Sequence, residues 1–102
     1  MAITGEIVLT EIVEQDGEQF AAYCLELGTA SCGDTIQEAF DNLEEAIWVH
    51  LNELEETGER ERVFREKNIL ITAWPQREQT SLLEVPLGKM LRATSHKVPV
   101  PA

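Results

Sequence analysis

The first 59 residues contain no lysine or arginine, although they carry 15 aspartate and glutamate side chains. Residues 60–102 carry 8 basic and 4 acidic side chains, so the two parts have formal charges of −15 and +4 within a total of −11. Nucleic acids and anionic membranes are bound by clustered lysine and arginine. The charge distribution therefore argues against both as ligands and raises the question of a basic partner for the first part.

Long apolar runs and cysteines are also scarce. The longest apolar run covers residues 20–25, whereas a membrane helix needs about 20 residues. The opening residues lack the basic and apolar stretches of a secretory signal, so we expect a soluble, cytoplasmic protein. The two cysteines, Cys24 and Cys32, form neither a disulfide framework nor the four-ligand set of a structural zinc site, and we expect two reduced thiols.

The chain is 102 residues long and 43% hydrophobic, which predicts one domain with a modest core. Residues 6–14 are rich in β-branched side chains and predict a strand. Ile7, Leu9 and Val13 lie on one face of that strand, and Val8 and Ile12 on the other. Apolar groups on both faces suggest that a helix covers one side of the sheet and a second subunit the other.

A hairpin and a short third strand follow in the sequence. Asp16 and Gly17 supply the positive φ values of a tight turn, residues 19–27 form the returning strand, and residues 29–32 form the third.

A helix is predicted over residues 35–57 because apolar side chains recur there at steps of three and four. Thr35 with Glu38 fits a capping box, Asp34 with Gln37 is the alternative register, and Gly58 is the natural stop. The outward side is acidic and holds Glu38, Asp41, Glu44, Glu45, Glu53, Glu55 and Glu56.

The remaining sequence predicts shorter elements. We expect one or two helical turns in residues 59–68, with Val63 and Phe64 facing inward. Strands are predicted at 69–74 and 81–85, a helical turn at 88–93 and a loose extended tail at 95–102. The basic side chains of the first of these segments are expected to pair with the acidic helix of the same or a neighbouring subunit; they are Arg60, Arg62, Arg65 and Lys67.

These elements together predict an α+β domain: a small antiparallel sheet of three or four strands with one long amphipathic helix packed across it. We expect a homodimer or higher homo-oligomer, with Trp48 as a candidate dimer contact because tryptophan is enriched at interfaces.

Three segments read FAAYCLEL at residues 20–27, GDTIQEA at 33–39 and NLEEAI at 42–47. In order and spacing they resemble the HicB family, whose pattern is F-x-A-x-x-P-E-L, then G-D-T, then a helix with E-A-x-x-N-L-x-x-A-I. The resemblance covers about residues 6–57. Leu25 stands where the family has proline, and residues 59–102 contain no segment suited to the DNA-binding domain of full-length members.

The resemblance implies a β-β-β-α-β domain like a truncated ribonuclease H fold, often paired through its sheet. It also implies an antitoxin-type binding module that neutralises a small basic ribonuclease of the HicA kind. The alternative is a stand-alone homo-oligomer of the same fold with no toxin partner. The predicted contact surface combines the acidic helix with a strand edge and consists of Tyr23, Glu26, Glu38, Asp41, Glu44, Glu45 and Glu53.

The sequence offers little for catalysis. Glu26 and Asp34 flank the connection into the long helix and are the only candidates for a metal-dependent hydrolase, but hairpin and capping roles explain them better. His50 falls on the apolar side of the helix with no Ser, Cys or second His at a partner spacing, and His96 falls in the predicted tail. We therefore expect no enzyme, no metal and no cofactor.

Overall fold

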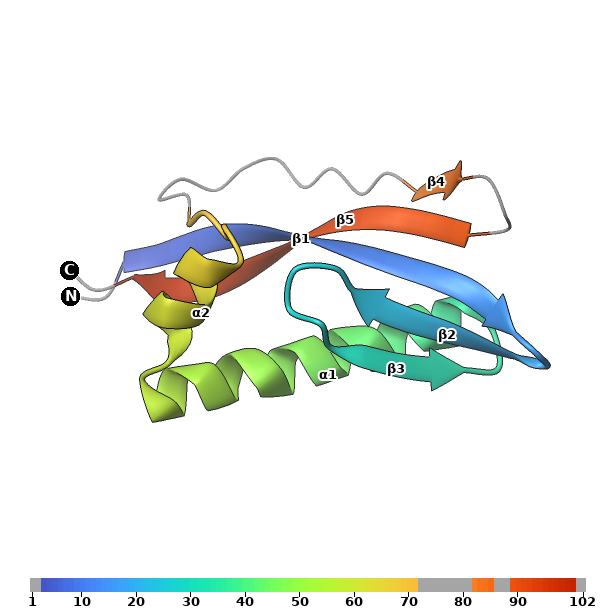
Figure 1. The fold of residues 1–102 in the computed structure, drawn as a ribbon, viewed down its shortest axis with the longest axis horizontal. Helices are drawn as coiled ribbons and strands as arrows, with labels where there is room; N and C mark the ends of the chain where they lie inside the picture. The colour runs from blue at the N-terminus through green and yellow to red at the C-terminus, as the bar shows by residue number, and fades with distance from the viewer. Residues whose placement is uncertain (1–2, 72–81, 86–88, 101–102) are drawn as a thin grey trace.

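The computed structural model describes residues 3–71, 82–85 and 89–100. Within these ranges one antiparallel sheet has the strand order β3-β2-β1-β5-β4, and a long helix lies across one of its faces (Figure 1). The α+β fold class is thereby confirmed, with five strands instead of three or four. The elements are β1 Ile3–Asp16, β2 Gln19–Cys24, β3 Ala30–Gly33, α1 Ile36–Thr57, α2 Arg60–Glu66, β4 Leu82–Val85 and β5 Lys89–Val100.

The core lies between α1 and the inner face of the sheet. Ile7, Leu9 and Val13 are 0–1% exposed on the face of β1 that meets the helix, as their alternation predicts. Val8 points to the other face and is 47% exposed. The hairpin to β2 turns at Gly17, whose φ is +65°, while Asp16 remains in the strand and pairs with Gln19.

Helix α1 begins and ends where the sequence predicts. The Thr35 hydroxyl oxygen accepts a hydrogen bond from the Glu38 backbone N–H at 3.0 Å, so the Thr35 register of the capping box is the correct one. Gly58 ends the helix in the left-handed conformation with φ +72°. The face turned to the sheet buries Ala39, Phe40, Leu43, Ile47 and Leu54.

The segment after α1 is helical, and part of its charge is neutralised within the chain. In α2, Phe64 is buried and Val63 partly buried, as predicted. Arg60 forms an ion pair with Glu55 of α1 at 3.0 Å, which confirms intrachain pairing of the basic segment for this residue. Arg62 instead pairs within its own segment, with Glu59 and Glu66.

Several predictions for the C-terminal part are wrong. Residues 69–71 form no strand, and the Ile69 N–H closes the end of α2 on the Phe64 carbonyl; the rest of that predicted strand lies outside the described residues. Residues 89–100 form neither a helical turn nor a loose tail, because β5 pairs with β1 continuously from Glu14↔Lys89 to Ile3↔Val100. The long β1 supplies backbone partners for all of β5, and this tertiary pairing overrides weak local signals.

Other strand boundaries differ in smaller ways. β2 ends at Cys24, so residues 25–27 of the predicted returning strand lie in a turn. The strand predicted at 81–85 is found as β4. In the described part of the chain, no helix is long and apolar enough to span a membrane.

Candidate functional site

A carboxylate lies in the core beneath α1. Glu11 shares the inner face of β1 with Leu9 and Val13 and is 0% exposed. One carboxylate oxygen, Oε1, accepts a hydrogen bond from Arg92 Nε at 2.8 Å and forms an ion pair with Arg92 Nη2 at 2.8 Å. The other, Oε2, accepts a hydrogen bond from the Thr94 hydroxyl at 3.0 Å.

The register of β5 explains why these groups meet. Arg92 lies opposite Glu11, Thr94 opposite Leu9, and His96 opposite Ile7. Because alternate side chains of a strand share a face, all three polar side chains of β5 point to the interior beside Glu11.

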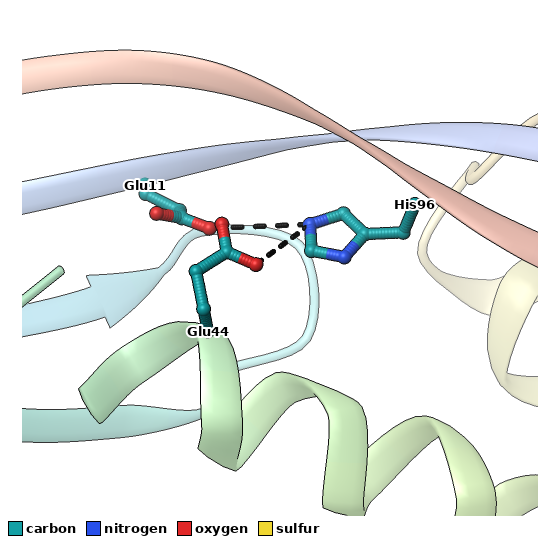
Figure 2. Close-up of side chains that lie close together, drawn as sticks. All are labelled: Glu11, Glu44 and His96. Carbon is teal, nitrogen blue, oxygen red and sulfur yellow. Dashed lines mark ion pairs between the residues drawn. The ribbon is translucent and has the colours of Figure 1, made fainter. Parts of the chain in front are cut away.

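Helix α1 adds a second carboxylate to this group (Figure 2). Glu44 Oε1 lies 3.3 Å from Arg92 Nη2, and Glu44 Oε2 lies 3.7 Å from His96 Nε2. His96 Nε2 is also 3.9 Å from Glu11 Oε2 and 2.8 Å from the Thr94 hydroxyl. We call these five residues, Glu11, Glu44, Arg92, Thr94 and His96, the Glu11 cluster; it joins β1, β5 and α1.

The cluster shifts the titration of its own members. Burial, together with the hydrogen bond and charge of Glu44, raises the pKa of Glu11 to about 7, although Arg92 acts in the opposite direction. Burial, with a contribution from Arg92, lowers the pKa of His96, against the attraction of Glu11. Near neutral pH the imidazole is therefore uncharged and Glu11 exchanges a proton.

Arg92 is fixed in place on its other side by an aromatic ring. Its guanidinium lies 3.9 Å from the centroid of the buried Phe40 ring, a cation–π contact. The single guanidinium of Arg92 faces the two carboxylates of Glu11 and Glu44. Because one positive charge balances only one of them, the cluster can accept a proton or a further cation. The arrangement is therefore suited to binding a cation at a site that is buried at Glu11 and open to solvent at Glu44.

The second candidate site is a groove on the surface of α1. It has a volume of about 450 Å³ and lies between α1 and the start of β3, where Thr29 and Ser31 line it. Glu45 and Glu53 on α1 line it together with Ala46 and Val49, and the remaining lining residues are Asn42 and His50. We call it the acidic groove. None of the Glu11 cluster lines it.

The predicted contact residues fall in different places. Glu38, Asp41, Glu45 and Glu53 are exposed on α1, and none of them forms an ion pair with a basic side chain among the described residues. Glu44 does not belong to that outward face, because its side chain turns toward the sheet and joins Arg92.

The predicted strand edge is wrong. Tyr23 lies in β2, which has β1 on one side and β3 on the other, so no edge is open there. Glu26 is partly buried and accepts hydrogen bonds from the Thr10 backbone N–H at 2.8 Å and from its hydroxyl at 2.9 Å. It therefore holds the turn after β2 against β1, which agrees with a hairpin role.

Other residues singled out in the sequence are also placed. Trp48 is 65% exposed on α1. Asp34 is exposed beside the N-terminus of α1, so it does not join Glu26 in an enclosed carboxylate pair. Cys24 is buried and Cys32 exposed, and both are free thiols.

The sequence reasoning missed the Glu11 cluster. Glu11 interrupts the inward-facing set Ile7, Leu9 and Val13, and Arg92, Thr94 and His96 repeat with a period of two. Alternating polar side chains of this kind indicate a shared face only if residues 89–100 are already known to form a strand. The sequence alone did not predict that strand. No family model, no curated protein and no solved structure matches the chain.

Proposed function

We propose that this chain is a binding module of the HicB-like, antitoxin type, whose acidic groove receives a small basic ribonuclease of the HicA kind. The order of its first four elements, β-β-β-α, with a later strand beside β1, agrees with the fold that the sequence resemblance implies. The proposed role is neutralisation by binding, without catalysis by this chain.

The acidic groove carries the proposal. Its rim residues Glu45 and Glu53 leave their carboxylates in solvent, and the apolar Ala46 and Val49 lie between them. Carboxylates without an ion-pair partner beside apolar side chains suit a lysine or arginine, whose aliphatic stem can pack on Ala46 and Val49 while its charged end reaches a carboxylate. The same charges steer a basic protein toward the groove.

Reversal of the rim charges is expected to weaken the complex. With a small basic ribonuclease of the HicA kind as the partner, to be sought in the gene next to this one, Glu45→Lys combined with Glu53→Lys should raise Kd by about 10- to 100-fold, because like charges then face each other across the interface. Association of the unaltered chain should also slow as salt rises. Calorimetric titration and stopped-flow kinetics measure the two effects.

The matched control carries the same change in net charge elsewhere. Glu14→Lys combined with Glu18→Lys alters the hairpin end of β1, away from the groove, and should change Kd by less than about threefold. Equal weakening by both pairs would mean that net charge alone drives association. Failure of the unaltered chain to bind the neighbouring basic protein would overturn the proposal.

The second candidate is a stand-alone homo-oligomer, and the face of the sheet opposite α1, on which no described helix packs, favours it. Val8 is 47% exposed there, and Ile12 and Leu91 pair across β1 and β5 on the same face, each partly buried. Neither helix contributes to this face, since α1 packs on the other. Apolar side chains in this position suit a second copy of the sheet.

Light scattering tests that candidate. The unaltered chain should have the mass of a dimer, and Val8→Glu should convert it to a monomer because a buried carboxylate at the interface is costly. Val49→Glu, equally apolar and exposed but on α1, is the control and should leave the dimer intact. A monomeric mass for the unaltered chain at high concentration would exclude the homo-oligomer.

A further inference from the structure

We propose that Glu11, Glu44 and His96 form a binding site for a divalent first-row transition metal ion, for which Zn²⁺ is the natural probe. The site is independent of the acidic groove and goes beyond the proposed partner binding. It would fasten α1 to the central strands, since one ligand comes from each of β1, α1 and β5.

The donor atoms already converge. One oxygen from each carboxylate and one imidazole nitrogen lie within 4.8 Å of one another (Figure 2). His96 Nε2 is 3.7 Å from Glu44 Oε2 and 3.9 Å from Glu11 Oε2. Zinc binds nitrogen and carboxylate oxygen at about 2.0–2.2 Å, so an ion between these three atoms requires side-chain movements of a few tenths of an ångström.

The carboxylates divide their oxygens between two functions. Each uses Oε1 to contact Arg92, at 2.8 Å for Glu11 and 3.3 Å for Glu44, and turns Oε2 toward the imidazole. Arg92 therefore orients both ligands from outside the metal site, as outer-sphere partners of metal ligands do. The Thr94 hydroxyl differs from Arg92, because it lies against the donor atoms themselves, 3.0 Å from Glu11 Oε2 and 2.8 Å from His96 Nε2, and a bound ion would replace these contacts.

The charge balance supplies an independent reason for a cation. Two carboxylates face a single guanidinium, and Glu11 is 0% exposed. With both carboxylates ionised the Glu11 cluster carries one more negative than positive charge, which a bound cation would balance.

The ligand set determines the class of ion. Imidazole binds zinc, iron, nickel and copper well, whereas magnesium and calcium prefer oxygen ligands alone. Three protein ligands leave a further position on a tetrahedral ion for water, and Glu44, whose side chain is 35% exposed, lies on the accessible side of the site.

Calorimetric titration with ZnCl₂ tests the site on the full chain after treatment with chelator, near pH 7.5. A Cys32→Ser background removes the exposed thiol as a competing ligand. We expect one Zn²⁺ per chain and a higher melting temperature on binding, because an ion that binds only the folded state stabilises it. MgCl₂ should give no binding at the same concentrations.

Variants locate the binding. His96→Gln and Glu44→Gln should each raise the Kd for Zn²⁺ by about tenfold or more, while His50→Gln and Glu45→Gln, which line the acidic groove outside the Glu11 cluster, should leave it unchanged. Circular dichroism checks folding, and Glu44→Gln, at the accessible end of the cluster, keeps the test valid should His96→Gln unfold. Absence of Zn²⁺ binding, or binding that Glu44→Gln leaves unchanged, would overturn the proposal.

Discussion

Replacement of Glu11 by glutamine is expected to remove a loss of stability that the unaltered, metal-free protein undergoes as pH rises. The folded pKa of Glu11 is about 7, against an ordinary value of 4.5, so the folded state keeps a proton that the unfolded state has released. Stability therefore falls between about pH 4.5 and pH 7 and stays low above that range. At 1.36 kcal/mol per pKa unit, the loss is roughly 3 kcal/mol.

Glutamine has the shape of protonated glutamate and cannot ionise. Glu11→Gln should match the unaltered protein in free energy of unfolding near pH 4 and exceed it by roughly 3 kcal/mol near pH 8, measured by urea denaturation in the presence of chelator. The lowered pKa of His96 has the opposite sign, because stability from an uncharged buried imidazole is lost as pH falls.

A control separates this effect from the general acidity of the chain. Glu14→Gln removes a carboxylate from the same strand, but on the outer face beside Lys89. Its free energy of unfolding should change with pH in the same way as that of the unaltered protein. If Glu11→Gln instead lost stability at pH 8, the pairing of Glu11 with Arg92 would outweigh its burial and its repulsion from Glu44.

The elements that the sequence predicted well are those whose signals are local. The Thr35 cap, the Gly58 stop and the apolar face of α1 depend on side chains within a few residues of each other. The inner face of β1 follows from a strict alternation. β5 was missed because its pairing partner is β1, at the other end of the chain, and nothing within residues 89–100 reports that pairing.

The candidate sites divide in the same way. The exposed acids of α1 were predicted because a helical period places them on one side. The Glu11 cluster could not be predicted, since it requires the β1–β5 register that puts Arg92 opposite Glu11 and the rotation of α1 that turns Glu44 inward. A buried carboxylate is rare unless it is paired, and the partners of Glu11 on β5 are known only from the structure.

Gly33→Ala is expected to destabilise the protein by about 3 kcal/mol, because β3 and the first turn of α1 touch at this glycine. A β-carbon at position 33 would lie 2.5 Å from the Ala39 backbone nitrogen and 2.8 Å from the Glu38 carbonyl carbon. Backbone atoms at both points cannot rotate away, so the strand and the helix must separate. The separation would also strain the hydrogen bond from Asn42 Nδ2 to the Cys32 carbonyl, now 2.8 Å long.

Gly17→Ala is the matched control, since it makes the same chemical change where a β-carbon meets nothing within 4 Å. Its φ of +65° limits the expected cost to about 1 kcal/mol, and both changes restrict the unfolded chain alike. If urea denaturation showed that Gly33→Ala and Gly17→Ala lower the free energy of unfolding equally, the close packing of β3 on α1 at Gly33 would be contradicted. Because Asn42 and the β3 residue Ser31 also line the acidic groove, Gly33→Ala should weaken binding of the basic partner even where the protein stays folded, whereas Gly17→Ala should not.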